Sequence, residues 1–384
     1  MKIVCASSVL SGEAAFRTLG DVVSVPEEEI TPEIVRDADA LMVRSRRRVD
    51  EALLSGSRVS FVGTATSGFD HLDVQFLDAA GIAWCAAPGC NANAVAEWCV
   101  TAMLGLAVRH GLVLEDLTLG IVGVGHVGAA LAQKALALEM KVLFNDPPRA
   151  LAEGAHDFVD LDALLDASDV VSLHVPLTEA GPFRTRHLAD HRFFERIRPG
   201  ALLLNTSRGE VVDTDALLFA MERGTVLGAA LDVWENEPAF RPDLLERVDF
   251  GTPHIAGHSL EGKLRGTMMV YEEACRFFEQ EPGRVDALDA SAPRNLLTAD
   301  GRARLEQDVL WDLASAAYPL AEDDRALRAC AHADAESRTT GFVQLRRDYR
   351  VRREFAAFDA LLTHCENGLA RKVDALGFRL AAES

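Results

Sequence analysis

Several features that would direct this chain to a membrane or to nucleic acid are missing from it. No run of 18 apolar residues occurs, which excludes a membrane-spanning helix, although hydrophobic residues make up 49% of the chain. Acidic residues outnumber basic ones by 59 to 39, and the net charge of −20 argues against nucleic acid or an anionic membrane as a partner. The first residues run straight into an expected strand over 2–5, with no signal-peptide pattern, so we expect a cytoplasmic protein.

Cysteine is scarce and shows no pairing pattern. The seven cysteines are scattered and mostly lie in apolar runs, which favours reduced thiols in the cytoplasm. Cys85 and Cys90 have no second pair nearby that would complete a zinc site. His254 and His258 are four residues apart, but Gly257 breaks the helix that such a metal-binding pair needs. We therefore expect no metal.

A glycine-rich turn is the most informative feature that is present. An apolar run over 117–122 predicts a buried strand, residues 129–139 favour a helix, and a second strand over 141–145 leads to Asp146. In a nucleotide-binding turn the first glycine permits the bend, the second admits a pyrophosphate, and the third lets the helix pack on the strand. We expect NAD to contact the turn residues Gly123, Gly125, His126, Val127 and Gly128. Asp146 can accept hydrogen bonds from the ribose and would repel the 2′-phosphate of NADP.

Apolar runs alternate with helical stretches over most of the chain, which predicts an α/β fold with two Rossmann-like doubly wound parallel-sheet domains. Expected strands in the first are 2–5, 21–25, 40–44, 59–63 and 82–85. Beyond the glycine motif they are 170–174, 201–205, 229–233 and 249–253. Expected helices are 11–19, 31–37, 72–80, 93–109, 161–167, 214–223 and 261–280.

These patterns predict three domains. Residues 1–93 and 257–280 form a flavodoxin-like, substrate-binding domain, residues 94–256 an NAD-binding Rossmann domain, and residues 281–384 a C-terminal α+β domain. We expect a polar linker over 285–300, a helix over 304–318, a basic amphipathic segment over 342–358 and a closing segment over 369–380. Because this last region has no nucleotide motif, it is either regulatory or an oligomerisation domain.

Polar residues that follow the expected strands supply the candidate catalytic groups, because ligands bind at the carboxyl ends of parallel strands. Arg208 can bind a carboxylate through its planar fork and polarise the neighbouring oxygen. His254 can accept a hydroxyl proton while a hydride leaves for the nicotinamide ring. Glu237 can hold the imidazole and stabilise its charged form. The three together suit oxidation of a hydroxyl group next to a carboxylate.

These residues carry a family resemblance. The glycine motif, the run from Asn205 to Gly209, Glu237-Pro238 and Pro253-His254 resemble the D-isomer-specific 2-hydroxyacid dehydrogenase family. The runs 87–92, 146–149 and 254–267 and the tail 342–355 are similar to a branch that oxidises a phosphorylated four-carbon 2-hydroxy acid in the pyridoxal 5′-phosphate pathway. That resemblance implies a homodimer formed by the C-terminal domain. A phosphoglycerate-type or other D-2-hydroxyacid dehydrogenase, or an idle NAD-sensing corepressor, stays open.

The resemblance also implies further site residues. Substrate contacts are Ser45, Thr66 and His258, of which His258 stands where the family usually has Tyr. Cofactor contacts beyond the turn are Asp146, Val175, Thr206, Ser207, Asp232 and Gly257. Val175 replaces the family's Thr.

Basic residues should gather near a substrate that carries a carboxylate and a phosphate, because the chain as a whole is acidic. Candidates within the chain are Arg44, Arg46, Lys263 and Arg265. The tail contains the densest basic cluster, namely Arg346, Arg347, Arg350, Arg352 and Arg353. These tail arginines either form a solvated helix face balanced by nearby acids or reach the active site of a partner subunit.

Overall fold

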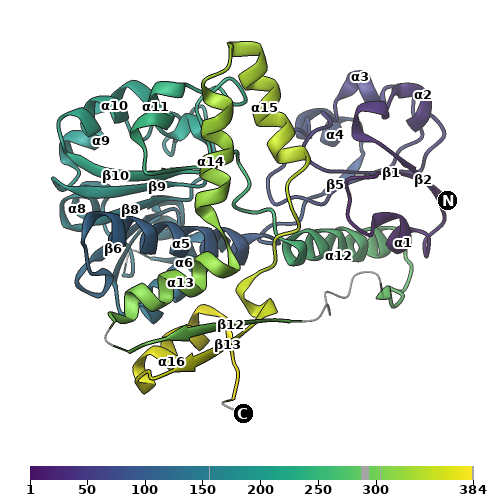
Figure 1. Cartoon of the computed structure of the whole chain (residues 1–384). Coiled ribbons are helices and arrows are strands. Elements are labelled where there is room, and N and C mark those ends of the chain that lie inside the picture. The colour runs from purple at the N-terminus through teal and green to yellow at the C-terminus, as the bar shows by residue number, and fades with distance from the viewer. Residues whose placement is uncertain (155, 287–293, 303, 383–384) are drawn as a thin grey trace. The chain divides into compact units, whose positions relative to one another are not determined.

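The chain folds into two compact units, each with its own parallel sheet (Figure 1). The computed structural model describes residues 1–154, 156–286, 294–302 and 304–382. Unit 1 consists of Met1–Ala92 and His258–Ala292, and unit 2 consists of Asn93–Gly257 and Pro293–Ser384. The predicted fold class is therefore confirmed for its two doubly wound parts.

Unit 1 is built on a five-stranded sheet in the order β2-β1-β3-β4-β5, in which every pair is parallel. Its strands are β1 (Lys2–Ala6), β2 (Asp21–Val25), β3 (Ala40–Val43), β4 (Phe61–Thr64) and β5 (Ala83–Cys85). Its helices are α1 (Gly12–Phe16), α2 (Pro32–Val35), α3 (Glu51–Leu54), α4 (Val74–Ala79) and α12 (Leu260–Phe277). Helix α12 packs closely on β4, since a Cβ atom at Gly63 would lie 2.3 Å from Val270.

Unit 2 is built on a six-stranded parallel sheet in the order β11-β10-β9-β8-β6-β7. Its strands are β6 (Thr118–Val122), β7 (Lys141–Asn145), β8 (Val170–Leu173), β9 (Ala201–Asn205), β10 (Val226–Leu231) and β11 (Phe250–Gly251). Its helices before residue 257 are α5 (Ala92–His110), α6 (His126–Ala137), α7 (Pro147–Glu153), α8 (Leu161–Ala167), α9 (His191–Arg196), α10 (Thr214–Glu222) and α11 (Pro242–Arg247). The strand order reverses between β6 and β8, where doubly wound sheets bind their ligands.

Both faces of this sheet are buried, and successive residues of one strand point into two different cores. Leu202 and Leu204 of β9 join a core with α5 and α6, whereas Leu203 between them joins a second core with α8, α9 and α10. This burial explains why the strands are almost continuously apolar.

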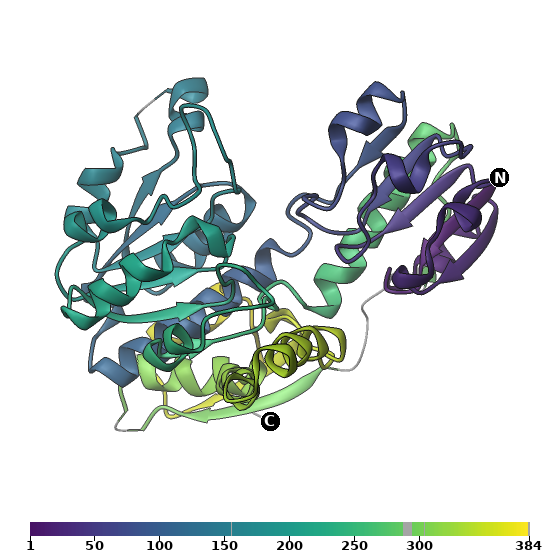
Figure 2. The same ribbon diagram turned by 90° about the horizontal axis from the view of Figure 1, so that it is seen from above.

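The C-terminal region is part of unit 2. Its described residues contain a small parallel sheet, ordered β12-β13-β14, and four α-helices. Its elements are β12 (Asn295–Asp300), α13 (Glu306–Ala317), α14 (Leu320–Ala331), α15 (Ala335–Arg347), β13 (Phe358–Thr363), α16 (Asn367–Leu376) and β14 (Arg379–Leu380). Figures 1 and 2 show β12, β13, α13 and α16 on the α5 and α6 side of the large sheet, and residues of α13 and α16 enter the same core as α5 and α6. Helices α14 and α15 instead contribute residues to the second core, with α8, α9 and α10.

Most expected strands and long helices are confirmed, but the C-terminal expectations need one correction. The linker expected over 285–300 is wrong at its end, because residues 295–300 form β12; residues 287–293 lie outside the described part. The basic amphipathic segment 342–358 contains the end of α15, at Arg347, and reaches the start of β13, at Phe358. Strand β12 pairs with β13, more than 60 residues later, so no local pattern announces it.

Candidate active site

The glycine turn has the geometry that a dinucleotide requires. Gly123 has a φ of +92°, and a Cβ there would lie 2.7 Å from the carbonyl oxygen of His174. A Cβ at Gly128 would lie 2.2 Å from the carbonyl oxygen of Gly123, so the third glycine lets α6 pack on the turn. A Cβ at Gly125 would meet no atom of the described chain within 4 Å, so this backbone is open to a pyrophosphate.

Helix α6 begins earlier than expected, at His126, with Gly125 as its N-cap residue. The expected start was residue 129, because the glycines hide the helical pattern. The first turn of a helix offers N–H groups without intrahelical acceptors and a partial positive charge. His126 and Val127 therefore place their backbone N–H groups in the position that binds the phosphates in such folds.

Asp146 lies beside the glycine turn. It follows β7, which pairs with β6 through Val122 and Asn145. Its carboxylate accepts a hydrogen bond from Val124 N at 2.8 Å and caps α7 through Arg149 N at 3.1 Å. The acid is thus held at the strand end where the ribose of a dinucleotide is bound, so the turn and Asp146 together fit NAD.

The ends of β8 and β9 carry the next group of expected cofactor residues. His174 bonds Ser172 Oγ through Nε2 at 2.8 Å and Thr206 Oγ1 through Nδ1 at 3.2 Å. Burial lowers the pKa of His174 to about 3, so this ring is neutral at physiological pH. Ser207 is fixed by its hydroxyl, which donates to Asn205 Oδ1 at 2.7 Å.

Val175 packs against the glycine turn, since a Cβ at Gly123 would lie 2.9 Å from its Cγ1 atom. The apolar Val175 therefore closes one side of the turn by packing rather than by hydrogen bonding.

Asp232 holds the segment 252–257 in place. Its Oδ1 accepts from Thr252 Oγ1 at 2.6 Å and from Ile255 N at 2.7 Å, and its Oδ2 accepts from Ala256 N at 2.9 Å. Its own carbonyl accepts from His254 N at 2.7 Å. Burial raises the pKa of Asp232, against the opposing effect of His254 and these hydrogen bonds. Asp232 was expected to contact the cofactor; its side chain here organises the segment that carries His254 and Gly257.

His254 and Glu237 form a hydrogen-bonded pair through Nδ1 and a carboxylate oxygen. Burial favours the neutral acid, but the charge and hydrogen bond of His254 and the charge of Arg346 outweigh it, so the pKa of Glu237 lies below its usual value. An ionised Glu237 can only accept, which places the ring proton on Nδ1. The Nε2 lone pair of His254 is then available to take a proton.

Arg208 lies at the end of β9, next to the strand that leads to Glu237. Its Nη1 donates to the Ser207 carbonyl at 2.8 Å, and Asn205 Nδ2 donates to the Arg208 carbonyl at 3.0 Å. The main chain at Gly209 passes so close to Trp234 that a Cβ would lie 2.0 Å from its carbonyl. This contact brings the Arg208 and Glu237 strand ends together.

The expected substrate residues lie in unit 1. Ser45 follows β3 and is exposed, and Thr66 follows β4, where its hydroxyl donates to the Gly68 carbonyl at 2.8 Å. His258 directly precedes Ser259, the N-cap residue of α12. The first two lie at carboxyl ends of strands, as ligand-binding residues of such sheets do.

A cation cluster, defined here as Arg44, Arg46 and Lys263, accompanies them in unit 1. The buried Glu27 accepts from Arg44 N at 2.9 Å and from Arg46 Nε at 3.0 Å. Within the described part of the chain, the Lys263 ammonium forms no hydrogen bond or ion pair. Burial, followed by the charges of Arg44 and Arg46, lowers the pKa of Lys263 to about 8. The positive charges of this cluster are suited to binding an anionic group of a ligand.

The tail arginines differ in their surroundings. Arg352 is only 3% exposed, and the positive charge of Arg346 helps to lower the pKa of Glu237. Arg347 is exposed, and the exposed Arg350 pairs with Asp323. These contacts were not predicted from the sequence, and neither was that of Trp98, whose indole donates to Thr252 Oγ1 at 3.1 Å. The sequence shows the spacing of the basic residues, but not the side chains and carbonyl groups with which they pair in the fold.

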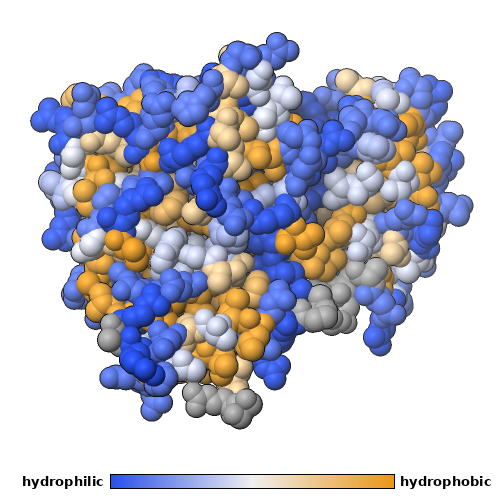
Figure 3. Space-filling view, viewed as in Figure 1, coloured by the Kyte–Doolittle hydropathy of each residue, from blue (hydrophilic) through white to orange (hydrophobic). Residues whose placement is uncertain are grey.

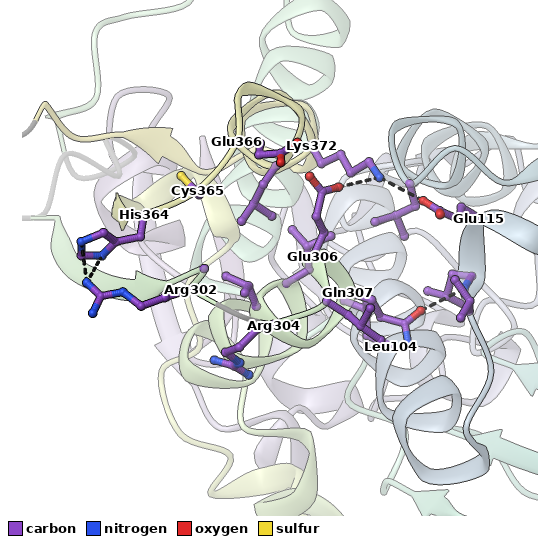
Figure 4. Close-up of a pocket in the computed structure, with 18 residues that line it drawn as sticks. Leu104, Glu115, Arg302, Arg304, Glu306, Gln307, His364, Cys365, Glu366 and Lys372 are labelled. Carbon is purple, nitrogen blue, oxygen red and sulfur yellow. Dashed lines mark hydrogen bonds and ion pairs between the residues drawn. The ribbon is translucent and has the colours of Figure 1, made fainter.

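A separate hollow of about 660 Å³ lies in unit 2 (Figure 4). Its lining includes Leu104, Glu306 and Lys372, with Lys372 Nζ 2.9 Å from Glu306. None of the residues assigned above to catalysis or NAD lines it. Among the described residues, no group of three metal-ligating side chains occurs, and no helix has the length and apolar character needed to cross a bilayer.

Comparison with known proteins agrees with this geometry. The model of the family "D-isomer specific 2-hydroxyacid dehydrogenase, NAD binding domain" matches residues 96–256, and a domain of unknown function matches residues 292–377. The fold resembles the crystal structure of NAD-bound 3-phosphoglycerate dehydrogenase from Entamoeba histolytica, with a TM-score of 0.63 and 27% identity. That match covers 76% of this chain and 99% of the other. The chain is an NAD-dependent dehydrogenase of the D-2-hydroxyacid class.

Curated relatives narrow the class further. Erythronate-4-phosphate dehydrogenase of Salinibacter ruber is 47% identical, with 92% of each chain covered. The enzyme of the same name from Klebsiella pneumoniae (strain 342) is 46% identical, with 96% of each chain covered. The chain belongs to the erythronate-4-phosphate dehydrogenase family.

Two glycine substitutions should separate folding from cofactor binding. Gly128→Ala places a methyl group against the Gly123 carbonyl and should lower the Tm by several degrees. Gly125→Ala meets no neighbouring atom, so its Tm should stay unchanged while NAD binding weakens on the order of 10-fold, about 1.4 kcal/mol. Thermal unfolding and NAD titration measure both effects. Wild-type NAD affinity in Gly125→Ala would contradict the assigned pyrophosphate site.

Removing the proposed base should stop turnover without releasing NAD. His254→Ala should lower kcat by about 100-fold or more, with little change in the Kd of NAD. The matched control is His187→Ala, because His187 also pairs with a glutamate, Glu235, at 2.7 Å but is not assigned to catalysis. Steady-state kinetics measure kcat, and NAD titration measures the Kd. Near-normal turnover in His254→Ala would exclude His254 as the base.

Proposed function

We propose that this protein oxidises the 2-hydroxyl of 4-phospho-D-erythronate to 3-hydroxy-2-oxo-4-phosphooxybutanoate with NAD, in pyridoxal 5′-phosphate biosynthesis. The names and coverage of its curated relatives support this substrate. The His254–Glu237 pair carries the proposal, because an NAD-sensing corepressor would not need a charged acid holding an imidazole.

Arg208, His254 and Glu237 of unit 2 each have one role in the proposed reaction. NAD supplies a hydride acceptor. Arg208 binds the substrate carboxylate and polarises the 2-oxygen as it becomes a carbonyl. His254 accepts the hydroxyl proton at Nε2 while its Nδ1–H stays on Glu237. The negative charge of Glu237 stabilises the imidazolium that results.

Unit 1 carries the proposed substrate contacts. By the family resemblance these are Ser45, Thr66 and His258, and His258 would donate through a ring N–H. The cation cluster has the charge needed to bind the phosphate of such a substrate. It also meets the expectation that an acidic chain needs local basic groups.

The substrate assignment is tested by NADH formation with 4-phospho-D-erythronate, unphosphorylated D-erythronate, 3-phosphoglycerate and D-lactate. We expect kcat/KM for 4-phospho-D-erythronate to exceed that for D-erythronate on the order of 100-fold, about 2.7 kcal/mol. A higher value for 3-phosphoglycerate would favour a phosphoglycerate dehydrogenase. NAD binding without turnover of any of these acids would favour a sensor.

The role of Lys263 in phosphate binding predicts a pH dependence. Its pKa of about 8 means that its charge is present below pH 8 and is lost above it. The KM for 4-phospho-D-erythronate should therefore rise as the pH passes 8. Lys263→Arg should abolish that rise because arginine stays charged, and Lys263→Met should raise KM on the order of 10-fold at pH 7. Identical pH profiles for wild type and Lys263→Arg would contradict the role.

We also propose a homodimer formed by the C-terminal region. Figure 3 shows apolar side chains over this region, where Leu296 of the edge strand β12 is 58% exposed. Leu296→Asp should then weaken the dimer in light scattering, whereas Leu151→Asp, at an even more exposed site on α7, should not.

The absence of disulfides among the seven cysteines supports a reducing compartment, the cytoplasm.

A further inference from the structure

The segment that carries His254 needs support on both sides. His254 has a φ of +56°, a left-handed conformation that costs a non-glycine residue energy. The amides of residues 254–256 are held by Asp232 on one side. A segment held only through its N–H groups can still tilt about them, so its carbonyl groups matter for the direction in which the imidazole points.

Arg352 supplies the second support. Its Nη1 donates to the Ala256 carbonyl at 2.7 Å, and its Nη2 donates to the Ala94 carbonyl of α5, also at 2.7 Å. The guanidinium lies 4.0 Å from the centre of the Tyr318 ring. This one planar group therefore fixes the His254 segment to the first turn of the longest helix of unit 2.

Arg352 is itself held by buried acids. Glu97 of α5 lies 3.8 Å from Arg352 Nη2 and accepts from Phe355 N at 2.9 Å. Asn93 Nδ2 donates to both Glu97 and Glu354, at 2.9 and 2.8 Å. Glu97, Arg352 and Glu354 are each 3% exposed or less. Because buried charges are costly unless paired in a fixed geometry, the position of Arg352 is closely defined.

We infer that Arg352 is a positioning residue of the active site, by which the C-terminal region aligns His254 of its own chain for proton transfer. The inference rests on the proposed role of His254 as the base. Arg352 does not touch the substrate; it acts through the Ala256 carbonyl, two residues from the imidazole. The C-terminal region thereby contributes to turnover within one subunit, apart from any part it plays in dimerisation.

The test substitutes Arg352 by Lys, which keeps the buried charge but cannot reach two carbonyls with a planar fork. We expect kcat to fall on the order of 10-fold or more, since small misplacement of a catalytic group is costly. KM for 4-phospho-D-erythronate and the NAD Kd should each stay within about 3-fold, because an interaction lost only in the transition state lowers kcat alone. Arg350→Lys is the matched control, since Arg350 lies in the same segment and pairs with Asp323 instead.

A second variant covers the case in which Arg352→Lys does not fold. Arg352→Met with Glu97→Gln removes the guanidinium together with the carboxyl group that faces it, and leaves Lys134 with Glu354 in the buried group. It should show the same loss of kcat. A folded variant of either kind with wild-type kcat, or a loss that Arg350→Lys shares equally, would overturn the inference. If His254→Ala itself keeps normal turnover, the proposed function fails instead, and the two failures are thus distinguishable.

Discussion

The chemistry of unit 2 depends on the hydrogen bonds that the buried Asp232 carboxylate accepts from residues 252–256. A buried carboxylate without such partners would be costly, on the order of 1–3 kcal/mol for each lost bond and more for a charge. Asp232 can stay buried because the segment wraps around it, and the N–H groups of the segment are held because Asp232 is there. The left-handed backbone at His254 and the pairing of its ring with Glu237 both follow from this mutual dependence.

Charge is distributed unevenly in this acidic protein. Buried or half-buried acids gather near the catalytic segment, where Glu237 is influenced by Arg346 and Glu97 by Lys134 and Arg352. Burial raises the pKa of Glu97 to about 8 despite those cations. Even with these cations beside it, the buried site therefore disfavours the negative charge of Glu97. Two of these cations come from the tail. The tail therefore balances acids that the nucleotide-binding region could not bury by itself.

The sequence predicts the nucleotide-binding turn well, because its strand, glycines, helix and acid are contiguous and each has a local physical reason. It also predicts that Arg208, Glu237 and His254 follow strand ends at one edge of a parallel sheet, and their catalytic roles stay a prediction. It fails where partners are remote. Strand β12 looks like a polar linker until β13 pairs with it, and Arg352 looks solvent-exposed until Ala94 and Ala256 provide its acceptors. The short helices α3, α7, α9 and α11 were not predicted, and neither was the longer helix α14.

The shared core of unit 2 constrains how the chain can fold during synthesis. The six-stranded sheet is complete once residue 251 has been made, yet the core around α5 and α6 includes Leu313, Leu369 and Phe378. Lys134 on α6 likewise donates a hydrogen bond to the carbonyl of Leu376, which forms only after that residue has been made. Domains generally fold from the N-terminus as the ribosome releases them, but the apolar side of α5 and α6 stays without this cover until residues 306–378 have been made.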